Sequence, residues 1–233
     1  MKNIVVTSYN NTLFDSYAFR FHKTYNWPFK LIVYNEDLPP RKPAINFYER
    51  VPELKKFVDT HKHIKFNSYR NDGVRFAYKV FAYTDAILNA DEDVTGLIGI
   101  DADSVFYKPI NDMWVKKCLH KDNHMMTYLG RGKHYSECGF LYWNLKHPRT
   151  KEYARAMQDL YISDKMYKLP EQHDSFLWDH MRVKFEQKYD VKNYDIGDGQ
   201  VGHVQARSVL GPIYDHTKGN RKKRGRSPEA RAE

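Results

Sequence analysis

The chain has 233 residues, a formal net charge of +9 and 41% hydrophobic residues. This length is typical of one α/β domain with a sizeable core. A mean hydropathy of −0.77, together with the lack of any apolar run near the ~20 residues of a spanning helix, excludes an integral membrane protein.

The sequence shows neither a targeting segment nor a disulfide framework. Residues 1–3 lead directly into the apolar residues 4–6, which leaves no room for the apolar core of a signal peptide. Cys118 and Cys138 form no C-x-x-C pair, so we interpret them as free thiols. We therefore expect a soluble protein in the reducing cytoplasm.

Positive charge is concentrated near the C-terminus. Residues 217–233 hold seven Lys/Arg and two Glu, a surplus of five out of the net charge of +9. We expect a single domain over residues 1–223 and a flexible basic tail over residues 224–233. Contact between this tail and nucleic acid or another polyanion is the alternative interpretation.

In chain order, a strand, a helix and a second strand come first. Residues 4–9 predict a strand, apolar residues at helical spacing predict a helix over 13–25, and residues 30–34 predict a strand that leaves into a loop containing Pro39 and Pro40. Such a unit gives a parallel pair with ligand sites at the carboxyl ends of its strands. Tyr9 lies at the first of these ends, as a candidate for stacking on a nucleotide base or as a core residue.

Two helices are predicted next, a short one over residues 52–58 and a stronger one from 71 to 88. Arg75 and Lys79 lie four residues apart on the second helix, so their side chains project from the same side. They are candidates for holding a diphosphate, and a solvated basic face is the alternative.

The apolar run over residues 96–100 is typical of a strand buried on both faces, and it stops at Asp101. Asp101 and Asp103 are two residues apart, so their carboxylates point to the same side and can share one hard cation. A simple turn-capping role for these aspartates is the alternative.

The remaining pattern continues as α/β. We expect a helical turn over 110–114, strands over 125–129 and up to Asn144, with the backbone at Gly139 close to a ligand, and a helix over 150–160 capped by Thr150. Another helix follows Pro170, with four polar residues in its first turn: Glu171, Gln172, His173 and Asp174. Capping alone would explain either carboxylate there.

Two of these motifs resemble a known family. Asp101-Ala102-Asp103 resembles the Asp-x-Asp motif of GT-A fold glycosyltransferases, which use sugar nucleotides. The stretch from His216 to Lys222 is similar to the H-x-x-G-x-x-K motif near the end of family 8 glycosyltransferases, the glycogenin and bacterial galactosyltransferase group. The resemblance implies that Asp101, Asp103 and His216 bind a metal, and that Gly219 and Lys222 meet the donor diphosphate.

Looser similarities and some departures accompany these motifs. The residues 171–174 resemble the family's D-Q-D segment, in which the acidic residue and the glutamine border the transferred sugar. Cys138-Gly139 with Asn144 is similar to its N-x-G strand, and Arg75 with Lys79 to its basic helix. The chain differs in having Glu171 for Asp, in lacking Pro-Trp after the final lysine and in being shorter than most members.

The resemblance implies a GT-A (Rossmann-like) fold, with a mostly parallel central sheet flanked by helices. We expect a metal-dependent hexosyltransferase with Mn²⁺, or Mg²⁺, a nucleotide-sugar donor such as a UDP-sugar, and retention of configuration. Gln172, Glu171 and Asp174 are the candidate catalytic residues, and either carboxylate would serve as general base if the reaction inverts.

The acceptor stays open. A saccharide, a lipid-linked sugar and a modified DNA base, the last as in a phage-type enzyme, all agree with the basic charge. Two other classes of protein are alternatives. One is a DNA-binding protein with a structural aspartate pair, and the other is a metal-dependent phosphoesterase, which would need more ligands for a two-metal site.

Overall fold

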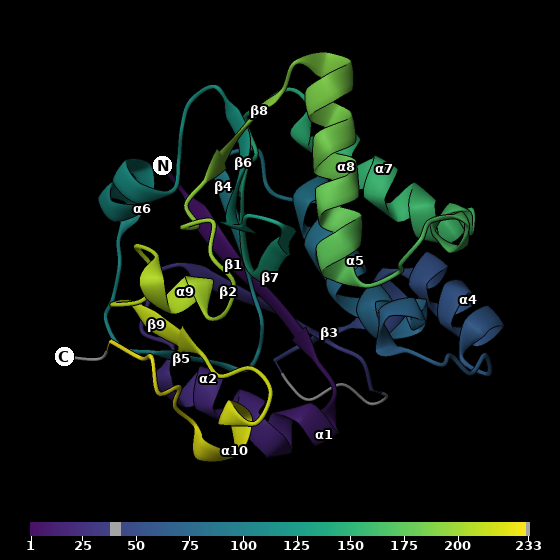
Figure 1. Cartoon of the computed structure of the whole chain (residues 1–233), viewed down its shortest axis with the longest axis horizontal. Helices are drawn as coiled ribbons and strands as arrows, with labels where there is room; N and C mark the ends of the chain where they lie inside the picture. The colour runs from purple at the N-terminus through teal and green to yellow at the C-terminus, as the bar shows by residue number, and fades with distance from the viewer. Residues whose placement is uncertain (38–42, 232–233) are drawn as a thin grey trace.

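The computed structural model describes residues 1–37 and 43–231. Pro39 and Pro40, expected in a loop, lie outside this part. A seven-stranded sheet forms the centre, in the order β3-β2-β1-β4-β7-β6-β8 (Figure 1). Its strands are β1 (Asn3–Tyr9), β2 (Lys30–Asn35), β3 (Ile45–Asn46), β4 (Gly96–Ile100), β6 (His124–Arg131), β7 (His134–Asn144) and β8 (Lys192–Asp195).

Most neighbouring strands of this sheet are parallel. β1 pairs in parallel with β2 and β4, β2 with β3, and β6 with β8. Only β7 runs against its neighbours β4 and β6 in the described residues. The predicted α/β class with a mostly parallel sheet flanked by helices is therefore confirmed.

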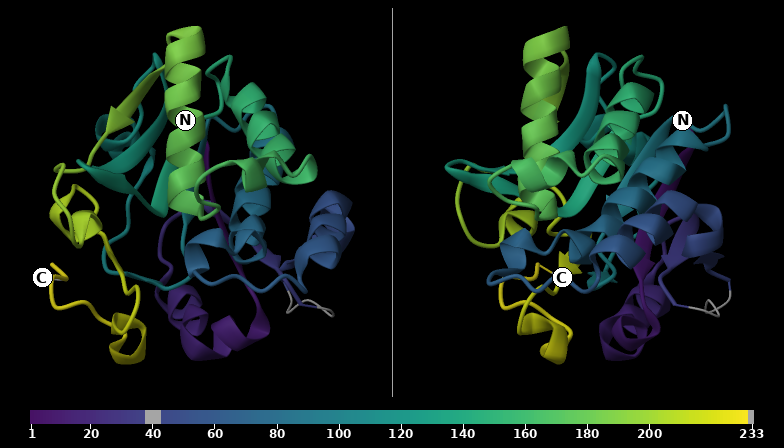
Figure 2. Two further views of the ribbon diagram at one scale, coloured as in Figure 1. Left: turned by 45° about the vertical axis from the view of Figure 1, so that its right-hand side comes forward. Right: turned by 90° about the vertical axis from the view of Figure 1, so that its right-hand side faces the viewer.

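Different elements cover the two faces of the sheet (Figures 1 and 2). One core contains α4 (Pro52–His61), α5 (Gly73–Leu88), α7 (Thr150–Ile162) and α8 (Asp174–Tyr189). The other contains α2 (Phe19–Thr24), α6 (Asp112–Cys118), α9 (Val204–Arg207) and the small antiparallel pair of β5 (Ser104–Phe106) and β9 (Tyr214–His216). Shorter helices are α1 (Asn11–Leu13), α3 (Phe47–Arg50) and α10 (Arg221–Arg224).

Strand β4 is buried along its whole length, as predicted. Leu97 packs into the core with α5, whereas Ile98 and Ile100 pack into the core with α6. This alternation follows from the period of two in a strand. Gly99 lies against the ring of Tyr83 from α5, where a larger residue would collide. The strand therefore holds the backbone just before Asp101 in a fixed position.

Three predicted helices differ in detail. The helix expected over 13–25 is interrupted by a π-helical segment, Phe14–Ala18, and ends at Thr24. Thr150 does not cap its helix, because its hydroxyl donates to the Asn144 carbonyl at 2.6 Å. The helix expected directly after Pro170 begins later, at Asp174, and His173 caps it through a bond from the Phe176 N–H.

Part of the C-terminal segment packs against the rest of the chain. Ser227 is only 2% exposed, and its N–H donates to Asp215 Oδ2 at 2.6 Å. Arg20 of α2 donates to the Lys222 carbonyl at 2.7 Å, so the segment lies beside the N-terminal helices (Figure 2). The described residues of the expected flexible tail, 224–231, are thus attached by Ser227. No helix in the described part of the chain has the length and apolar character to cross a membrane.

Candidate metal and nucleotide site

A cavity of about 1280 Å³ opens at the carboxyl ends of β1 and β4. Because β7 is antiparallel to β4, its first residues reach the same edge, where the Asp101 N–H donates to the Gly139 carbonyl at 3.1 Å. The first turns of α5 and α8 and the chain after β9 complete the wall. This is the edge at which open α/β sheets bind ligands.

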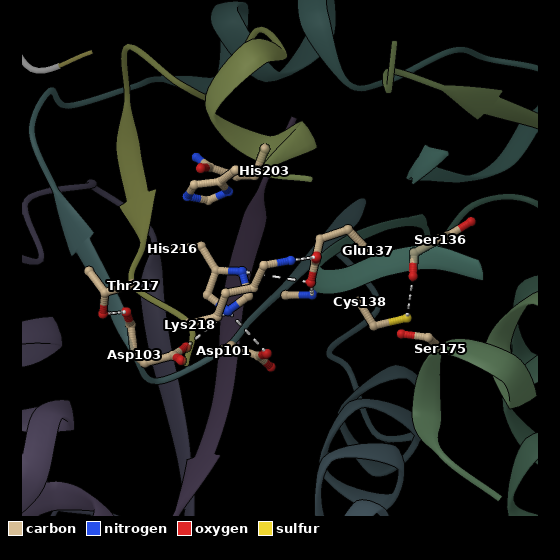
Figure 3. Close-up of polar contacts among 12 residues, drawn as sticks. Asp101, Asp103, Ser136, Glu137, Cys138, Ser175, His203, His216, Thr217 and Lys218 are labelled. Carbon is tan, nitrogen blue, oxygen red and sulfur yellow. Dashed lines mark hydrogen bonds and ion pairs between the residues drawn. The ribbon is translucent and has the colours of Figure 1, made fainter. Parts of the chain in front are cut away.

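Asp101, Asp103 and His216 meet at the floor of this cavity (Figure 3). His216 Nε2 lies 3.1 Å from Asp103 Oδ1 and 3.5 Å from Asp101 Oδ2. The pairing of β5 with β9 makes this possible, since it sets Ser104 opposite His216. Thr217 also donates its N–H and its hydroxyl to the Asp103 carbonyl. Residues far apart in sequence therefore form one group.

The three side chains fit a divalent cation. Neighbouring ligands in an octahedral shell with bonds near 2.1 Å lie about 3 Å apart, which matches the separations around His216 Nε2. Each carboxylate binds a lysine with its other oxygen, Asp101 through Lys79 at 2.7 Å and Asp103 through Lys222 at 3.0 Å. Asp103 Oδ1 is buried without a hydrogen bond from the described residues. Two oxygens and one imidazole nitrogen therefore face a common point.

Charge–charge interactions shift the pKa values of this group. Burial alone lowers the pKa of His216, but Asp103, Glu137 and Asp101 outweigh it and raise the pKa to about 8. Burial also raises the pKa of Asp103, yet the cations of His216 and Lys222 hold it below its usual value. The pKa of Asp101 is raised, mainly by burial. The imidazolium is thus the counter-ion of the carboxylates, and a metal would take its place when the proton leaves.

Lys79 reaches the centre of the site, whereas Arg75 stays at its mouth. Lys79 Nζ lies 2.7 Å from Asp101 Oδ1 and 2.6 Å from Asp174 Oδ2, and it donates to the Cys138 carbonyl at 3.2 Å. Burial lowers the pKa of Lys79, but the two carboxylates outweigh burial and raise it well above its ordinary value. Arg75 is exposed and forms no ion pair with the described residues.

The chain after His216 lies over the cavity, and we call residues 217–226 the C-terminal strap. Lys222 Nζ lies 4.4 Å from the ring centre of Tyr17, in addition to its ion pair with Asp103. Gly219 has a φ of 64°, a conformation that glycine adopts without strain. Lys218 pairs with Glu137. Both predicted diphosphate residues, Gly219 and Lys222, therefore line the cavity.

Of the three predicted catalytic residues, only Asp174 lines the cavity. Gln172 is buried, and its amide donates to the Met166 and Leu169 carbonyls and accepts from Asn71. These bonds fix the loop before α8, and Gln172 is not among the residues that line the cavity. Glu171 lies between Arg70 at 3.1 Å and His173 at 2.6 Å, two residues that line the cavity, but is not itself part of the lining.

Tyr9 is not available to a nucleotide base. It is 2% exposed, its hydroxyl lies 2.6 Å from His22 Nε2, and its ring packs on Phe14. Tyr9 is therefore a core residue, because its buried ring has no face exposed for stacking on a base. Leu13 and Tyr17 line the cavity instead, from the broken helix that follows β1.

Sequence reasoning missed Glu137. This carboxylate is buried at the start of β7, 3.7 Å from His216 Nδ1 and 3.4 Å from Arg131 Nη1. Burial raises its pKa, but His216 and Lys218 outweigh burial and lower the pKa to about 2. A carboxylate two residues before Gly139 in an apolar strand is the signal that would have indicated it. The close approach expected at Gly139 is made by the His216 ring, which a Cβ would overlap.

Comparisons with known proteins give only distant likenesses. No protein-family model matches the chain, and no curated protein matches it significantly. Solved structures that resemble it include a glycosyltransferase involved in the glycosylation of the major capsid of PBCV-1, at 10% identity and a TM-score of 0.47, over 97% of this chain and 98% of that one. Another is the glycosyltransferase GlyE of Streptococcus pneumoniae TIGR4, at 15% identity and a TM-score of 0.47, over 83% of this chain and 46% of that one. A third is mouse xyloside xylosyltransferase 1, at 9% identity and a TM-score of 0.45, over 84% of this chain and 86% of that one. At these scores we argue function from the site itself.

Proposed function

We propose that the protein is a metal-dependent glycosyltransferase that moves a hexose from a nucleotide-sugar donor, with UDP as the nucleotide. The convergence of Asp101, Asp103 and His216 beneath a lysine-bearing strap supports this proposal. Transfer from a sugar nucleotide breaks a bond to a diphosphate, and negative charge grows on the leaving oxygen. A cavity that combines a cation site with Lys218 and Lys222 suits that charge.

Each group has a proposed task. Asp101, Asp103 and His216 would hold Mn²⁺, with Mg²⁺ as the alternative, because this mixed oxygen and nitrogen set suits both ions. The bound cation would supply Lewis acidity at the diphosphate. The strap, with Gly219 and Lys222, would contact the diphosphate and exclude water. Asp174, held by Lys79, would border the transferred sugar, and we propose that configuration is retained.

A thermal-shift panel of UDP, GDP, CDP and ADP, each with and without Mn²⁺, tests the donor site. A ligand at ~100 times its dissociation constant adds about 2.7 kcal/mol to the free energy of unfolding. For a chain of this size, this raises the melting temperature by about 5–11 °C. We expect a shift with UDP only when Mn²⁺ is present. A shift with none of the nucleotides would contradict the proposal.

Substituting one metal ligand separates chemistry from folding. Asp103→Ala should abolish Mn²⁺-dependent transfer of the sugar while the circular dichroism spectrum stays that of the native protein, because Asp103 contributes a ligand oxygen that no neighbour replaces. Full activity of this variant would rule out the metal site. The anomeric configuration of the product, read by NMR, distinguishes retention from an inverting reaction with Asp174 as base.

The acceptor is proposed to be a saccharide, a lipid-linked sugar or modified DNA. DNA binding without transfer is the second candidate function, and the four consecutive basic residues of α10 favour it. Within the fold, however, Lys222 pairs with Asp103 and Arg221 with Glu229. Tight, salt-sensitive DNA binding combined with no nucleotide-dependent shift would favour this candidate over a transferase.

A further inference from the structure

Three buried polar side chains lie outside the metal site and join distant parts of the C-terminal region. They are His203 before α9, Asp215 in β9 and Ser227 beyond α10, each no more than 2% exposed. Ser227 donates its N–H to Asp215 Oδ2 at 2.6 Å. His203 Nε2 lies 3.1 Å from Ser227 Oγ and 3.3 Å from Asp215 Oδ1.

This trio is not a second catalytic centre. A catalytic serine–histidine–aspartate arrangement uses one ring nitrogen for the serine and the other for the carboxylate. Here both partners contact the same nitrogen, His203 Nε2. The Ser227 hydroxyl is also buried and is not among the residues that line the 1280 Å³ cavity. The contacts are therefore structural in kind.

The position of the trio in the chain gives it a consequence for the metal site. Asp215 immediately precedes the metal-ligand candidate His216, and β9 is fixed by its pairing with β5. Ser227 Oγ also lies 3.5 Å from the His216 carbonyl oxygen, to which it donates. The contacts therefore bring residue 227 back to the strand that residue 216 ends, so the strap between them is a closed loop. Lys218, Gly219 and Lys222 lie on this loop.

Closing the loop restricts the strap before any ligand arrives. A segment held at one end explores many conformations, and fixing both ends removes most of that freedom. Inside the loop, Arg20 donates to the Lys222 carbonyl at 2.7 Å, and Gly225 turns the chain with a φ of 67°. The buried ends and these two contacts together set Lys222 above the cavity.

We propose that Ser227, Asp215 and His203 are positioning residues that lock the C-terminal strap over the donor site. They act through Lys218, Gly219 and Lys222 and touch no substrate. The effect on nucleotide binding rests on the proposed function, whereas the effect on strap mobility does not. When the strap is already ordered, nucleotide binding does not have to supply the free energy of ordering it.

Limited trypsin digestion of the full chain without nucleotide tests the lock directly, since the strap offers six Lys/Arg sites. Ser227→Ala removes the hydroxyl and should speed cleavage between residues 218 and 226 by about tenfold. Asp215→Ala should raise it further, because it also removes the acceptor of the Ser227 N–H. The milder Ser227→Ala keeps the test valid if the aspartate variant does not fold.

Ser208→Ala is the matched control. Its hydroxyl is buried and donates to the Gln205 carbonyl at 2.8 Å, and among the described residues it forms no hydrogen bond with the strap. We expect a similar loss of thermal stability and native-like cleavage of the strap. Cleavage of Ser227→Ala at the native rate would refute the proposal that Ser227 holds the strap in place. Equal acceleration of cleavage in Ser208→Ala would refute it too.

A binding measurement then connects the lock to the donor site. In Ser227→Ala, the dissociation constant of UDP with Mn²⁺ should rise about three- to tenfold, while that of Mn²⁺ alone stays within about twofold, because Asp101, Asp103 and His216 are unchanged. If the native protein binds no nucleotide, the proposed function fails and the proteolysis result still stands. If nucleotide binds equally well to native protein and variant, the positioning role is refuted.

Discussion

Lys79 is the side chain on which the charge balance of the site depends most. It lies between Asp101 and Asp174, with exposed side-chain fractions of 18%, 23% and 10% for the three groups. Lys79→Met keeps much of the volume of the side chain and removes the charge. Two largely buried carboxylates then lose their shared partner, and such a loss typically lowers the free energy of unfolding by about 3–5 kcal/mol.

The lower part of that range applies, because Asp101 keeps the imidazolium of His216 at 3.5 Å. A loss of about 3 kcal/mol corresponds to a fall of about 6–12 °C in the melting temperature of a chain of this length. The loss should be largest near neutral pH. Burial already raises the pKa of Asp101, and without Lys79 the pKa rises further. Protonation on acidification then removes the unpaired charge, so the deficit shrinks toward pH 5.

Calorimetry of native protein and variant at about pH 7.5 and pH 5 measures both effects. Lys55→Met is the matched control, since Lys55 also pairs with an aspartate, Asp59, but both side chains are about half exposed. Because solvent screens its charges, that pair should contribute little to stability. A melting temperature of Lys79→Met within about 2 °C of native, or a deficit that grows on acidification, would refute the reasoning.

Two further predictions concern His216, the proposed metal ligand. Gly139→Ala should weaken Mn²⁺ binding by at least about tenfold, because the added methyl group would overlap the imidazole ring; unchanged affinity in titration calorimetry would contradict this packing. Since Mn²⁺ must displace a proton whose pKa is about 8, affinity should fall about tenfold per pH unit below that value. A flat profile between about pH 6 and pH 8 would show that His216 is not a ligand.

The features around this site that the sequence indicates are local in origin. The apolar run before Asp101 indicates a buried strand, and the period of two puts Asp101 and Asp103 on the same side. Both inferences need only neighbouring residues. His216 and Lys222 lie more than a hundred residues away, and spacing alone says nothing of their distance from Asp101. Resemblance to a family motif supplied that link.

The positions that differ from expectation depend on tertiary packing. Tyr9 and Tyr17 both follow the first strand, but the π-helical segment Phe14–Ala18 turns Tyr17 toward the cavity and leaves Tyr9 enclosed. Gln172 and Asp174 are two residues apart, yet α8 begins between them, so only Asp174 faces Lys79. Which side a polar residue faces at a helix start depends on how the helix docks, and composition does not encode that.

The two lysines that pair with the aspartates differ in how readily a ligand could replace their partners. Lys79 has two carboxylate partners and a carbonyl acceptor, and its burial makes the loss of either ion pair costly. Lys222 is held to Asp103 by one ion pair and is 34% exposed, in the middle of the strap. Under the proposed function, a phosphate oxygen of the donor would take Lys222 from Asp103 at small cost, which would free a carboxylate oxygen next to the proposed cation site. In this proposal, Lys79 would fix the orientation of Asp101, while Lys222 would couple the position of the strap to the ion pairing of Asp103.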